Sequence, residues 1–410
     1  MEKTPTDPAT PRATVIRYVK PQQWSRYDRA AVLEPLARAK AAVLSLRTVP
    51  YQRAWVEELQ QAQLKREIAG TSRIEGADFT EGELDAALKD QGEPLHTRAQ
   101  RQAHAAMKAY KWIATVPDDR PIDRALIREL HTMIVTGADD DHCPPGVLRS
   151  KDSNVLLGAP RHRGVEGGDE CERCFDELLR SFRLELNAHD PLIQGLMLHY
   201  HFAAMHPFVD GNGRTARALE ALVLQRAGLR AACFIPMSNY YYDEKRNYLT
   251  ALAEVRAGDH DLTPFVVFGL LGIELQCHRL LGEIQSHIQK ALFRNLMFDL
   301  FHRLRTPKRR VIVERQLEIL KLLLRQPMML SQLSQSLNSS YRNMSAPWRA
   351  LIRDLNELIG LGAVEARLIA DKNDHELSVR LSWPTEITET EFFKRIKELP
   401  KAKSHAVLQI

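Results

Sequence analysis

The chain has 410 residues, of which 44% are hydrophobic and 27% charged, and its formal net charge is +5. At about 150 residues per domain this length predicts two or three domains, and the ordinary apolar content excludes a disordered or collagen-like chain. No run of about 18 apolar residues is evident, and the N-terminus lacks the apolar core of a secretory signal, so we expect a cytoplasmic protein without a membrane span. Five cysteines, an odd number, do not make a disulfide scaffold.

Six segments are expected along the chain from its changes in pattern. They are a flexible, proline- and threonine-rich tail (1–20), an N-terminal helical region (21–95), a helical core (96–285), a linker helix (286–305), a C-terminal module (306–385) and a C-terminal tail (386–410). In the second segment, apolar residues recur at helical spacing until Gly70 ends the pattern. Thr80, followed three residues later by Glu83, predicts a capping box at the start of the next helix.

A turn-rich stretch at 137–168 interrupts the helices of the core. Its one short apolar run, Asn154–Gly158, predicts a small β-hairpin or flap over residues 153–163. Helical patterns resume after it and continue to about Leu304. The sequence therefore predicts an all-α core that carries one small flap.

The C-terminal module has the pattern of a winged helix. Three helical segments are followed by two β-prone runs on either side of the turn 371–374. Residues 303–380 contain 14 Lys and Arg against 8 Asp and Glu, so this α+β module is mildly basic. Contact with DNA or RNA through Arg349, Arg353 and Lys372 is one interpretation. Docking of a protein target, or packing on the core, is the other.

The segment from His206 to Arg217, HPFVDGNGRTAR, carries the residues that point to chemistry. Its Gly-Asn-Gly turn lies directly before a helix, so backbone N–H groups and a helix N-terminus converge as an anion site. Arg214 and Arg217 lie three residues apart and face the same side, where both can bind further phosphates. Asp210 can give a carboxylate oxygen to Mg²⁺, and His206 can accept a proton near neutral pH. Together these residues indicate transfer of a phosphoryl or nucleotidyl group to a hydroxyl.

This segment resembles the signature of the Fic family, HPF-x-[D/E]-GNGR-x-x-R, without a departure. The resemblance covers about residues 30–285 and implies an all-α Fic fold with a small β-hairpin flap. Fic enzymes usually transfer AMP from ATP to a Ser, Thr or Tyr hydroxyl of a protein and release pyrophosphate. The related Doc-type toxins phosphorylate instead; they carry Lys at the position of Gly213 and lack the second arginine. Gly213 and Arg217 therefore favour AMP transfer.

The resemblance also implies a role for each residue of the signature. His206 is expected to deprotonate the target hydroxyl, and Asp210 is expected to hold Mg²⁺. The remaining positions are expected to contact the phosphates of ATP. The α-phosphate is expected to contact Gly211, Asn212 and Gly213. The β-phosphate is expected to contact Arg214, and the γ-phosphate is expected to contact Arg217.

Residues 71–76, TSRIEG, are similar to the family's inhibitory motif, [S/T]-x-x-x-E-[G/N], whose fixed positions here are Thr71, Glu75 and Gly76. Glu75 is expected to form a bidentate pair with Arg217 and so compete with the γ-phosphate of ATP. As a bare pattern, Glu-Gly also ends ordinary helices. In some relatives the same glutamate helps to position water for removal of AMP, so the resemblance implies deAMPylation as a further activity.

Two segments outside the signature are expected to contact the nucleotide. The flap stands where the family aligns the target by β-augmentation, with Leu157, Gly158 and Ala159 lining the nucleotide pocket. Tyr248 stands where relatives close over adenine. For the neighbouring residues 240–242, packing in the core is an equal alternative.

Other histidines and cysteines give weaker metal-binding patterns. Cys171 and Cys174 have the spacing of a zinc half-site, but a second CxxC pair is absent, so ordinary core or surface positions are favoured. His199 and His201 lie on different faces of a helix, which favours packing or hydrogen bonding over a metal.

The sequence therefore predicts a self-inhibited protein AMPylator that uses ATP and Mg²⁺. Its expected partners are ATP, a target protein that docks on the flap, a second copy of the chain in a homodimer, and DNA if the winged helix binds it. The alternative is a DNA-binding transcriptional regulator whose Fic domain senses nucleotide without turnover. His206 and Asp210 favour the enzyme, because a sensor needs neither a base nor a metal ligand.

Overall fold

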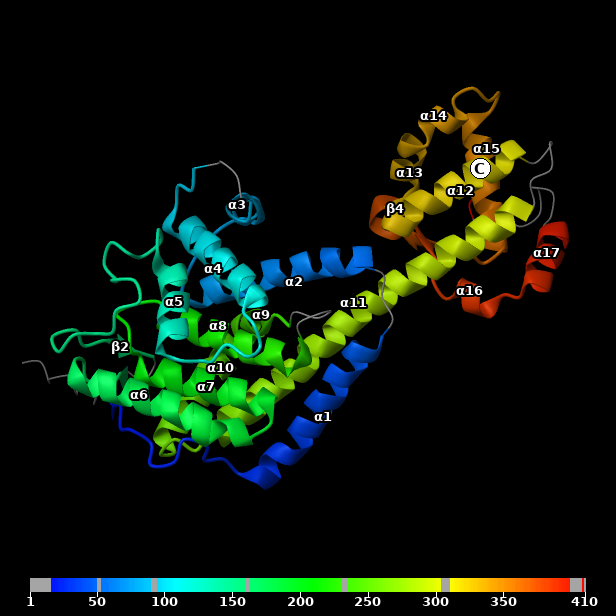
Figure 1. Ribbon diagram of the computed structural model, residues 1–410. Coiled ribbons are helices and arrows are strands. Elements are labelled where there is room, and N and C mark those ends of the chain that lie inside the picture. Colours follow the sequence, from blue (N-terminus) through cyan, green and yellow to red (C-terminus); the bar gives the residue numbers. More distant parts are fainter. Residues whose placement is uncertain are drawn as a thin grey trace, which may run out of the picture. The chain divides into compact units, whose positions relative to one another are not determined.

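The computed structural model describes residues 16–49, 53–89, 94–158, 162–229, 235–303, 310–398 and 408. The chain divides into two compact units, residues 1–282 and residues 283–410. Helices dominate both units, with one small sheet in each (Figure 1). The expectation of a mostly helical protein with small sheets is therefore confirmed.

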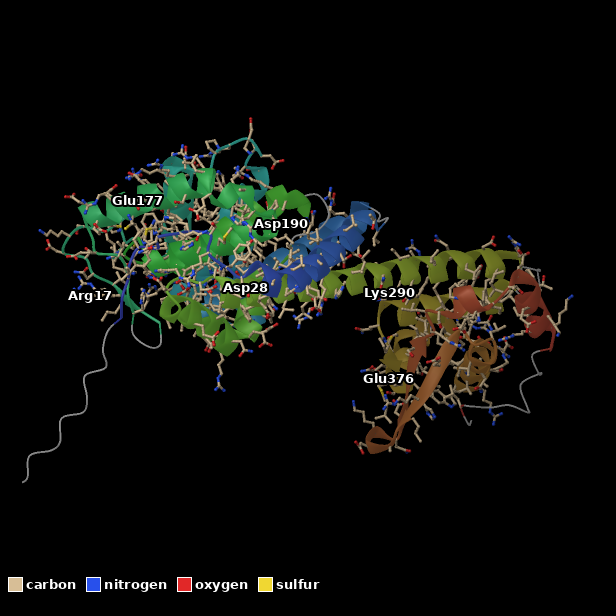
Figure 2. The ribbon with its side chains drawn as sticks, turned by 90° about the horizontal axis from the view of Figure 1, so that it is seen from below. Arg17, Asp28, Glu177, Asp190, Lys290 and Glu376 are labelled. Carbon is tan, nitrogen blue, oxygen red and sulfur yellow. The ribbon has the colours of Figure 1, made fainter. Side chains whose placement is uncertain are left out.

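The first unit is built from helices whose starts are fixed by polar caps. Asp28, labelled in Figure 2, accepts the N–H groups of Ala30 and Ala31 at 2.8 and 3.3 Å and begins α1. Thr80 and Glu83 form the predicted capping box at α3. The helices of this unit are α1 (Arg29–Thr48), α2 (Arg53–Ile74), α3 (Glu81–Ala87), α4 (Arg98–Thr115), α5 (Arg124–Val135), α6 (Asp169–Leu184), η1 (Leu186–Ala188), α7 (Pro191–Met205), α8 (Asn212–Leu224), η2 (Gln225–Leu229), α9 (Met237–Asp243), α10 (Lys245–Ala257) and the first part of α11 (Thr263–Arg303).

Helices α7 and α8 form the centre of the first unit. Every residue of α7 from Leu192 to Met205 is buried, and so are Asn212 and all residues from Arg214 to Leu224 in α8. Most of these side chains are apolar, so their burial is the main stabilising contribution to this unit. The turn that joins the two helices, residues 206–211, is thereby held between two buried helices.

A three-stranded sheet lies beside this centre and contains the predicted flap. Strands β2 (Leu156–Leu157) and β3 (His162–Arg163) pair antiparallel, which confirms the hairpin. Strand β1 (Ile16–Arg17) pairs parallel to β3, so the order is β1-β3-β2. The predicted flexible tail over 1–20 is thus wrong for residues 16–20. Tyr18 N–H donates to Arg163 O at 2.9 Å, and His260 Nε2 lies 2.6 Å from Val19 O, so both contacts hold this segment in place.

The second unit has the elements expected of the C-terminal module. Its helices and strands are α12 (Arg310–Arg325), β4 (Met328–Met329), α13 (Leu330–Ser336), α14 (Asn338–Tyr341), α15 (Pro347–Gly360), β5 (Val364–Ile369), η3 (Ala370–Lys372), β6 (Asp374–Val379), α16 (Trp383–Glu386) and α17 (Glu389–Glu398). The sheet has the order β4-β6-β5. The helices and the two-stranded wing lie where the sequence patterns place them, and the assignment to the winged-helix class stays a prediction.

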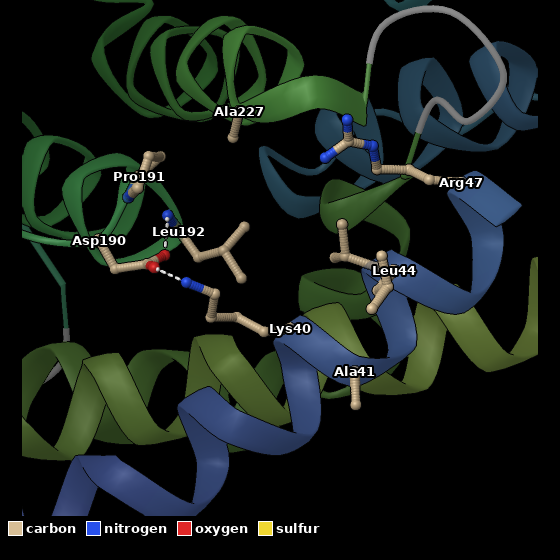
Figure 3. Close-up of a pocket in the computed structure, with 9 residues that line it drawn as sticks. Lys40, Ala41, Leu44, Arg47, Asp190, Pro191, Leu192 and Ala227 are labelled. Atoms are coloured by element: carbon tan, nitrogen blue, oxygen red, sulfur yellow. Dashed lines mark hydrogen bonds and ion pairs between the residues drawn. The ribbon is translucent and has the colours of Figure 1, made fainter.

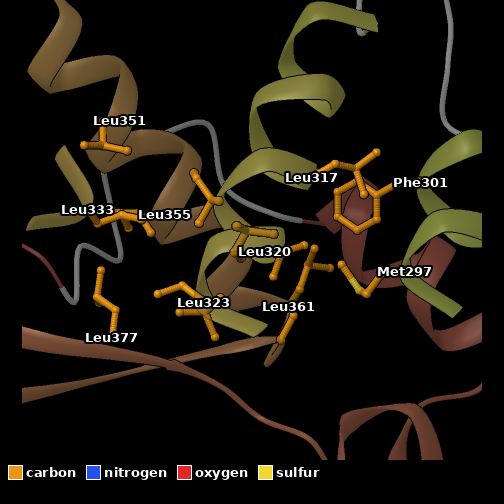
Figure 4. Packing of buried hydrophobic residues seen from close by; sticks show 14 of the residues in the cluster. Met297, Phe301, Leu317, Leu320, Leu323, Leu333, Leu351, Leu355, Leu361 and Leu377 are labelled. Carbon is orange, nitrogen blue, oxygen red and sulfur yellow. The ribbon is translucent and has the colours of Figure 1, made fainter. Parts of the chain in front are cut away.

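Apolar side chains from nearly every element of the second unit share one core (Figure 4). It includes Phe293, Met297 and Phe301 from the end of α11, so the described part of the expected linker helix, residues 286–303, also packs in the core of this unit. Phe392 of α17 is also fully buried in it. The predicted tail 386–410 therefore begins with a packed helix, because α17 carries an amphipathic face that this core covers.

Helix α11 departs from the expectation that no segment is long and apolar enough to span a membrane. Within Thr263–Phe301 an 18-residue window has a mean hydropathy of 1.3, so by length and composition alone this helix could cross a membrane. Half of that window is buried in the structure. Core helices of folded domains are equally long and apolar. In α11 the apolar residues Phe265, Leu270 and Phe293 are fully buried against the rest of the protein.

Candidate active site

The active-site turn begins at His206, where α7 ends. Its backbone has φ 55° and ψ 60°, the left-handed conformation that terminates many helices but that few non-glycine residues adopt. The His206 N–H still bonds to Phe202 O at 3.0 Å, and Arg149 Nε donates to His206 O at 2.7 Å. The histidine is therefore held in an uncommon conformation at the mouth of the turn.

The imidazole of His206 is oriented for accepting a proton. Its Nδ1 lies 2.9 Å from Ala203 O, and because a carbonyl only accepts, Nδ1 must carry the hydrogen. In the neutral ring this leaves Nε2 as the acceptor. Burial lowers the pKa of His206, an effect that the Ala203 carbonyl, Glu75 and Asp210 oppose without reversing it. The ring is therefore neutral at pH 7, as a general base must be.

The turn itself is closed by Asn212. Its side-chain oxygen accepts Phe208 N–H at 2.9 Å, and its amide donates to Phe208 O at 2.8 Å. Both bonds of the carboxamide therefore go to the backbone of Phe208, and the expected contact of Asn212 with the α-phosphate stays a prediction. Phe208 is fully buried, as expected for a residue that fixes the turn against the core.

His131, which sequence reasoning missed, supports the turn from α5. Its ring stacks on Phe208 with a centroid distance of 3.7 Å. Gly146 N donates to Nδ1 at 3.0 Å, so Nε2 carries the hydrogen that bonds to Asp210 O at 3.0 Å. Burial lowers the pKa of His131 to about 4, so this support is uncharged at neutral pH. Gly211, with φ +74°, leaves space for the imidazole of His131. A Cβ at this position would come within 2.8 Å of Val135 Cγ1 and 3.4 Å of His131 Nε2.

Asp210 points its carboxylate toward polar groups of residues 98–142. Its Oδ1 accepts Gly211 N–H at 2.6 Å, while Oδ2 lies 2.9 Å from His142 Nε2 and 3.1 Å from Arg98 Nη2. Partial burial raises the pKa of Asp210, but the bond to His142 and the charge of Arg214 outweigh it and hold the pKa below its usual value. The carboxylate is therefore ionised.

A divalent cation fits this place. Ligand atoms of Asp139, His142 and Asp210 all lie within 4.8 Å of one another. Two carboxylates and an imidazole are donors that divalent metals accept in proteins. Asp139 and His142 belong to the turn-rich stretch, and only their positions in the fold bring them to Asp210.

Arg214 is buried and paired. Its Nη1 donates to Asp139 Oδ2 at 2.6 Å, and Nη2 lies 3.4 Å from Asp210 Oδ1. Among the described residues, its buried Nε has no hydrogen-bond partner. A buried donor left open beside a helix N-terminus leaves capacity for an anion, which agrees with the phosphate contact expected of this residue.

Arg217 is bound by the segment 71–75, as the sequence predicted. Its Nη2 donates to Glu75 Oε1 at 2.6 Å and to Thr71 O at 3.1 Å, and its Nε donates to Thr71 Oγ1 at 2.9 Å. The expected bidentate pair with Glu75 is wrong, because Thr71 takes the second edge of the guanidinium. The charge of Arg217 and its bond outweigh burial and hold the pKa of Glu75 below its usual value.

Helix α2 is anchored tightly to α9 and continues through Gly70 to Ile74, so the expectation that Gly70 ends this helix is wrong. Gly70 lies against the backbone of α9, where a Cβ would come within 2.5 Å of Ser238 and Asn239. Buried Glu67 accepts Tyr110 OH at 2.6 Å and Ser238 N–H at 2.8 Å. Lys245 Nζ caps the last turn by donating to Ile74 O at 2.9 Å. Gly76 follows with φ +90°, a conformation that suits glycine at the end of a helix.

Tyr248 lies in the core and not over an open nucleotide pocket. It is 3% exposed, stacks on Tyr241 with a centroid distance of 4.7 Å, and its OH lies 3.0 Å from His199 Nε2. Burial raises the pKa of Tyr248 to about 12. The expected contact with adenine is therefore not available in this conformation. Tyr240 and Tyr241 are buried as well, which favours the packing alternative.

The flap residues are brought partly into place. Leu157 is paired with His162, and Gly158 has φ +72° at the turn, while Ala159 lies outside the described residues. Arg149, buried and missed by sequence reasoning, joins the flap to the turn. Its guanidinium donates to Ser153 O at 2.7 Å, to Val165 O, and to His206 O.

The cysteines and histidines with weaker metal-binding patterns are buried in the first unit. Cys171 and Cys174 are buried free thiols, and their Sγ atoms lie near Pro207 O and Glu170 Oε1. In the described part of the chain they join no group of metal-binding side chains. His201 bonds to Trp24 O, as expected for a core histidine. A groove between α1 and the start of α7 (Figure 3) shares no residue with the site around His206; it is lined by Lys40, Ala41, Val43, Leu44, Arg47, Asp190, Pro191, Leu192 and Ala227.

The turn at 206–211 and the helices that support it match a known protein family. Residues 121–224, from α5 to the end of α8, match the model of the Fic/DOC family. The chain contains a Fic domain. The matched range contains His131, Asp139 and His142 as well as the whole signature. It therefore includes both segments that contribute side chains to the site, residues 131–142 and residues 206–217.

Known relatives of this Fic domain carry the name protein adenylyltransferase. The chain is 32% identical over 165 residues to protein adenylyltransferase fic-1 of Caenorhabditis briggsae, which covers 39% of this chain and 29% of the relative. To the Caenorhabditis elegans protein of that name it is 32% identical over 103 residues, which covers 25% of this chain and 19% of the relative. The chain thus spans less than a third of the length of these relatives.

Solved structures show the same fold. A Fic family protein from Desulfovibrio desulfuricans G20 has a TM-score of 0.56 at 18% identity and covers 87% of this chain and 98% of its own. Fic-1 of C. elegans, residues 134–508, has a TM-score of 0.51 at 20% identity and covers 63% of this chain and 73% of its own.

Proposed function

We propose that this protein is a self-inhibited protein adenylyltransferase, which transfers AMP from ATP to a Ser, Thr or Tyr hydroxyl of a target protein. One observation carries the proposal. The Nε2 acceptor of His206 lies at the mouth of a turn whose other end is a helix N-terminus bearing Arg214 and Arg217. The names of the Fic relatives support the same activity.

In the proposed reaction His206 Nε2 takes the proton of the target hydroxyl. The hydroxyl oxygen then bonds to the α-phosphorus, and the bond between the α-phosphorus and the oxygen leading to the β-phosphate breaks in line, so pyrophosphate leaves. N–H groups at the start of α8 and the open Nε of Arg214 stabilise phosphate charge. Mg²⁺ bound at Asp210 would neutralise charge between the phosphates.

Self-inhibition follows from the contacts of Arg217 in this proposal. ATP needs this guanidinium for its γ-phosphate, but Thr71 and Glu75 already hold it. A nucleotide that binds while Glu75 stays in place must lie in a pose unsuited to in-line attack. The same carboxylate lies against Gly213 in the first turn of α8. From there it could position a water molecule for attack on an AMP-modified target, and on this basis we propose deAMPylation as well.

The target protein is proposed to dock on the flap. In the order β1-β3-β2, the outer edge of β3 is covered by β1, so β2 offers the edge to which an incoming strand can pair. Leu156 in β2 is 50% exposed, as an apolar contact for that strand would be. The protein itself, and a second copy in a homodimer, are proposed as targets or partners on the same basis.

A regulator that binds DNA and only senses nucleotide remains the alternative. In the second unit Arg349 is exposed, while Arg353 is bonded to Asp354, so the proposed nucleic-acid contact keeps one of its two helix arginines. Against the alternative stands His206, whose uncommon backbone and oriented ring serve a base but have no use in a sensor.

The test is label transfer from ATP. Protein carrying Glu75→Gly is incubated with Mg²⁺ and ATP labelled at the α-phosphate, and a parallel sample receives γ-labelled ATP. Label retained from the α position alone supports AMP transfer. Label from γ alone would make the protein a kinase, and label from neither, with cell lysate present, together with DNA retardation at physiological salt, would favour the regulator.

A further inference from the structure

The imidazole of His142 lies in contact with the carboxylate that the proposed function assigns to the metal. Its Nε2 is 2.9 Å from Asp210 Oδ2, and both side chains are partly open to solvent, at 42% and 34% exposure. Around an octahedral metal with bonds of about 2.1 Å, two neighbouring ligand atoms lie about 3.0 Å apart. The pair therefore already has the separation of adjacent ligands.

A third side chain orients this imidazole as metal-binding histidines are oriented. Asp141 Oδ1 lies 2.6 Å from His142 Nδ1, so a carboxylate holds the hydrogen on Nδ1 and fixes the ring with Nε2 toward Asp210. A metal at this place would take the position of the hydrogen that Nε2 now donates to Asp210 Oδ2. Arg98 Nη2 lies 3.1 Å from Asp210 Oδ2 and 3.4 Å from His142 Nε2. Positive charge is thus already drawn to Asp210 Oδ2.

Asp139, the other member of the group, is committed elsewhere. It is fully buried, and both of its oxygens accept bonds: Oδ1 from Arg98 and Gln102, and Oδ2 from Gln102 and Arg214. It holds the two arginines and offers no open lone pair at the solvent side. The two members that solvent reaches are the imidazole of His142 and the carboxylate of Asp210.

We propose that His142 is a second protein ligand of the catalytic metal and that it gives the site a preference for Mn²⁺ and similar transition metals over Mg²⁺. Imidazole nitrogen suits first-row transition metals, among which Mn²⁺ also takes carboxylate and water ligands, whereas Mg²⁺ prefers oxygen alone. The inference rests on the proposed function in one respect, since nucleotide phosphates and water complete the shell. Asp141 supports the ligand, and Arg98 withdraws when the metal binds.

The test measures Mn²⁺ alone, without turnover. Electron paramagnetic resonance titration of the full chain with Mn²⁺ is run for wild type, His142→Ala, His142→Gln and Asp141→Asn, with His375→Ala, in β6 of the second unit, as a matched control. We expect Mn²⁺ affinity to fall about 10- to 100-fold in His142→Ala, His142→Gln and Asp141→Asn. In the control it should stay unchanged. Mg²⁺ affinity, measured by competition, should change by less than about threefold, because Mg²⁺ keeps water in place of nitrogen.

Pulsed resonance spectra should show coupling of bound Mn²⁺ to an imidazole ¹⁴N that disappears in His142→Ala. Thermal melting checks that each variant is folded. Equal Mn²⁺ affinity in wild type and His142→Ala, absence of nitrogen coupling, or equal losses for Mn²⁺ and Mg²⁺ would each overturn the proposal. A protein that binds Mn²⁺ through His142 but transfers no AMP would refute the proposed function and leave this inference standing.

Discussion

The carboxylate of Glu75 lies directly over Gly213, so that a Cβ added at Gly213 would collide with Glu75 Oε1. Gly213 is in the first turn of α8, whose N–H groups point toward the place proposed for the phosphates. Glu75 therefore does two things at once: it holds Arg217, and it fills space at the helix N-terminus. Removing its side chain should free both.

Glu75→Gly is expected to raise AMP transfer by about 10- to 100-fold, since a hydrogen bond between charged groups contributes about 1.5–3 kcal/mol. Rates of α-label incorporation measure this. Glu81→Gly is the matched control, because Glu81 is exposed and pairs with Lys65 and Arg73 rather than with Arg217. Equal rates in Glu75→Gly and wild type would sink the inhibitory assignment.

Gly70→Ala should activate the enzyme while leaving Glu75 in the chain. Its new methyl group would meet the backbone of Ser238 and Asn239 in α9, so α2 must move away, at a cost of about 1–3 kcal/mol. We expect faster label incorporation together with a lower melting temperature. Gly82→Ala is the control, since a Cβ there meets nothing within 4 Å. A variant that melts early without any gain in transfer would show that α2 does not restrain Arg217.

The pH dependence of transfer should have its acid limb below pH 6.5. The base works in its neutral form, and burial lowers the pKa of His206, so the rate rises as pH increases through this lowered pKa and is level above it. Glu75 raises the pKa of His206, hence Glu75→Gly should move the limb to lower pH still. Rates at saturating ATP between pH 4.5 and 8 measure this, and a limb above pH 6.5 would contradict the burial of the ring.

The second unit should depend on one buried carboxylate. Asp354 is fully buried and pairs with Arg315 Nε at 2.8 Å, and Tyr341 OH donates to it at 2.9 Å. Asp354→Ala would leave the buried guanidinium without its counter-charge, which costs about 3–5 kcal/mol. Denaturant unfolding measures the loss. The control Asp371→Ala, on the exposed wing turn, should change stability by less than about 0.5 kcal/mol.

Much of the site could be predicted because its central part is local in sequence. The turn from His206 to the start of α8 is made by contiguous residues, so spacing alone places the base, the glycines and the arginines together. The capping box at Thr80 is local in the same sense. The contact of Glu75 with Arg217 spans 142 residues, and only the resemblance to known inhibitory motifs could indicate it.

What could not be predicted depends on tertiary packing. His131 and His142 approach Asp210 from residues 79 and 68 positions away, through a stretch whose sequence reads as turns. Strand β1 pairs in parallel with a partner about 146 residues on, which no local pattern encodes. The burial of Tyr248 is hidden from the sequence for a related reason, because an aromatic residue at helical spacing does not reveal whether its face meets a ligand or the core.

The most direct test of the account is the intact mass of Glu75→Gly protein after incubation with Mg²⁺ and ATP, compared with the double variant that also carries His206→Ala. The account predicts a mass gain of one AMP on the first protein and none on the second, with ATP binding nearly equal in both. A gain of a single phosphate, or an AMP gain that persists without His206, would contradict it.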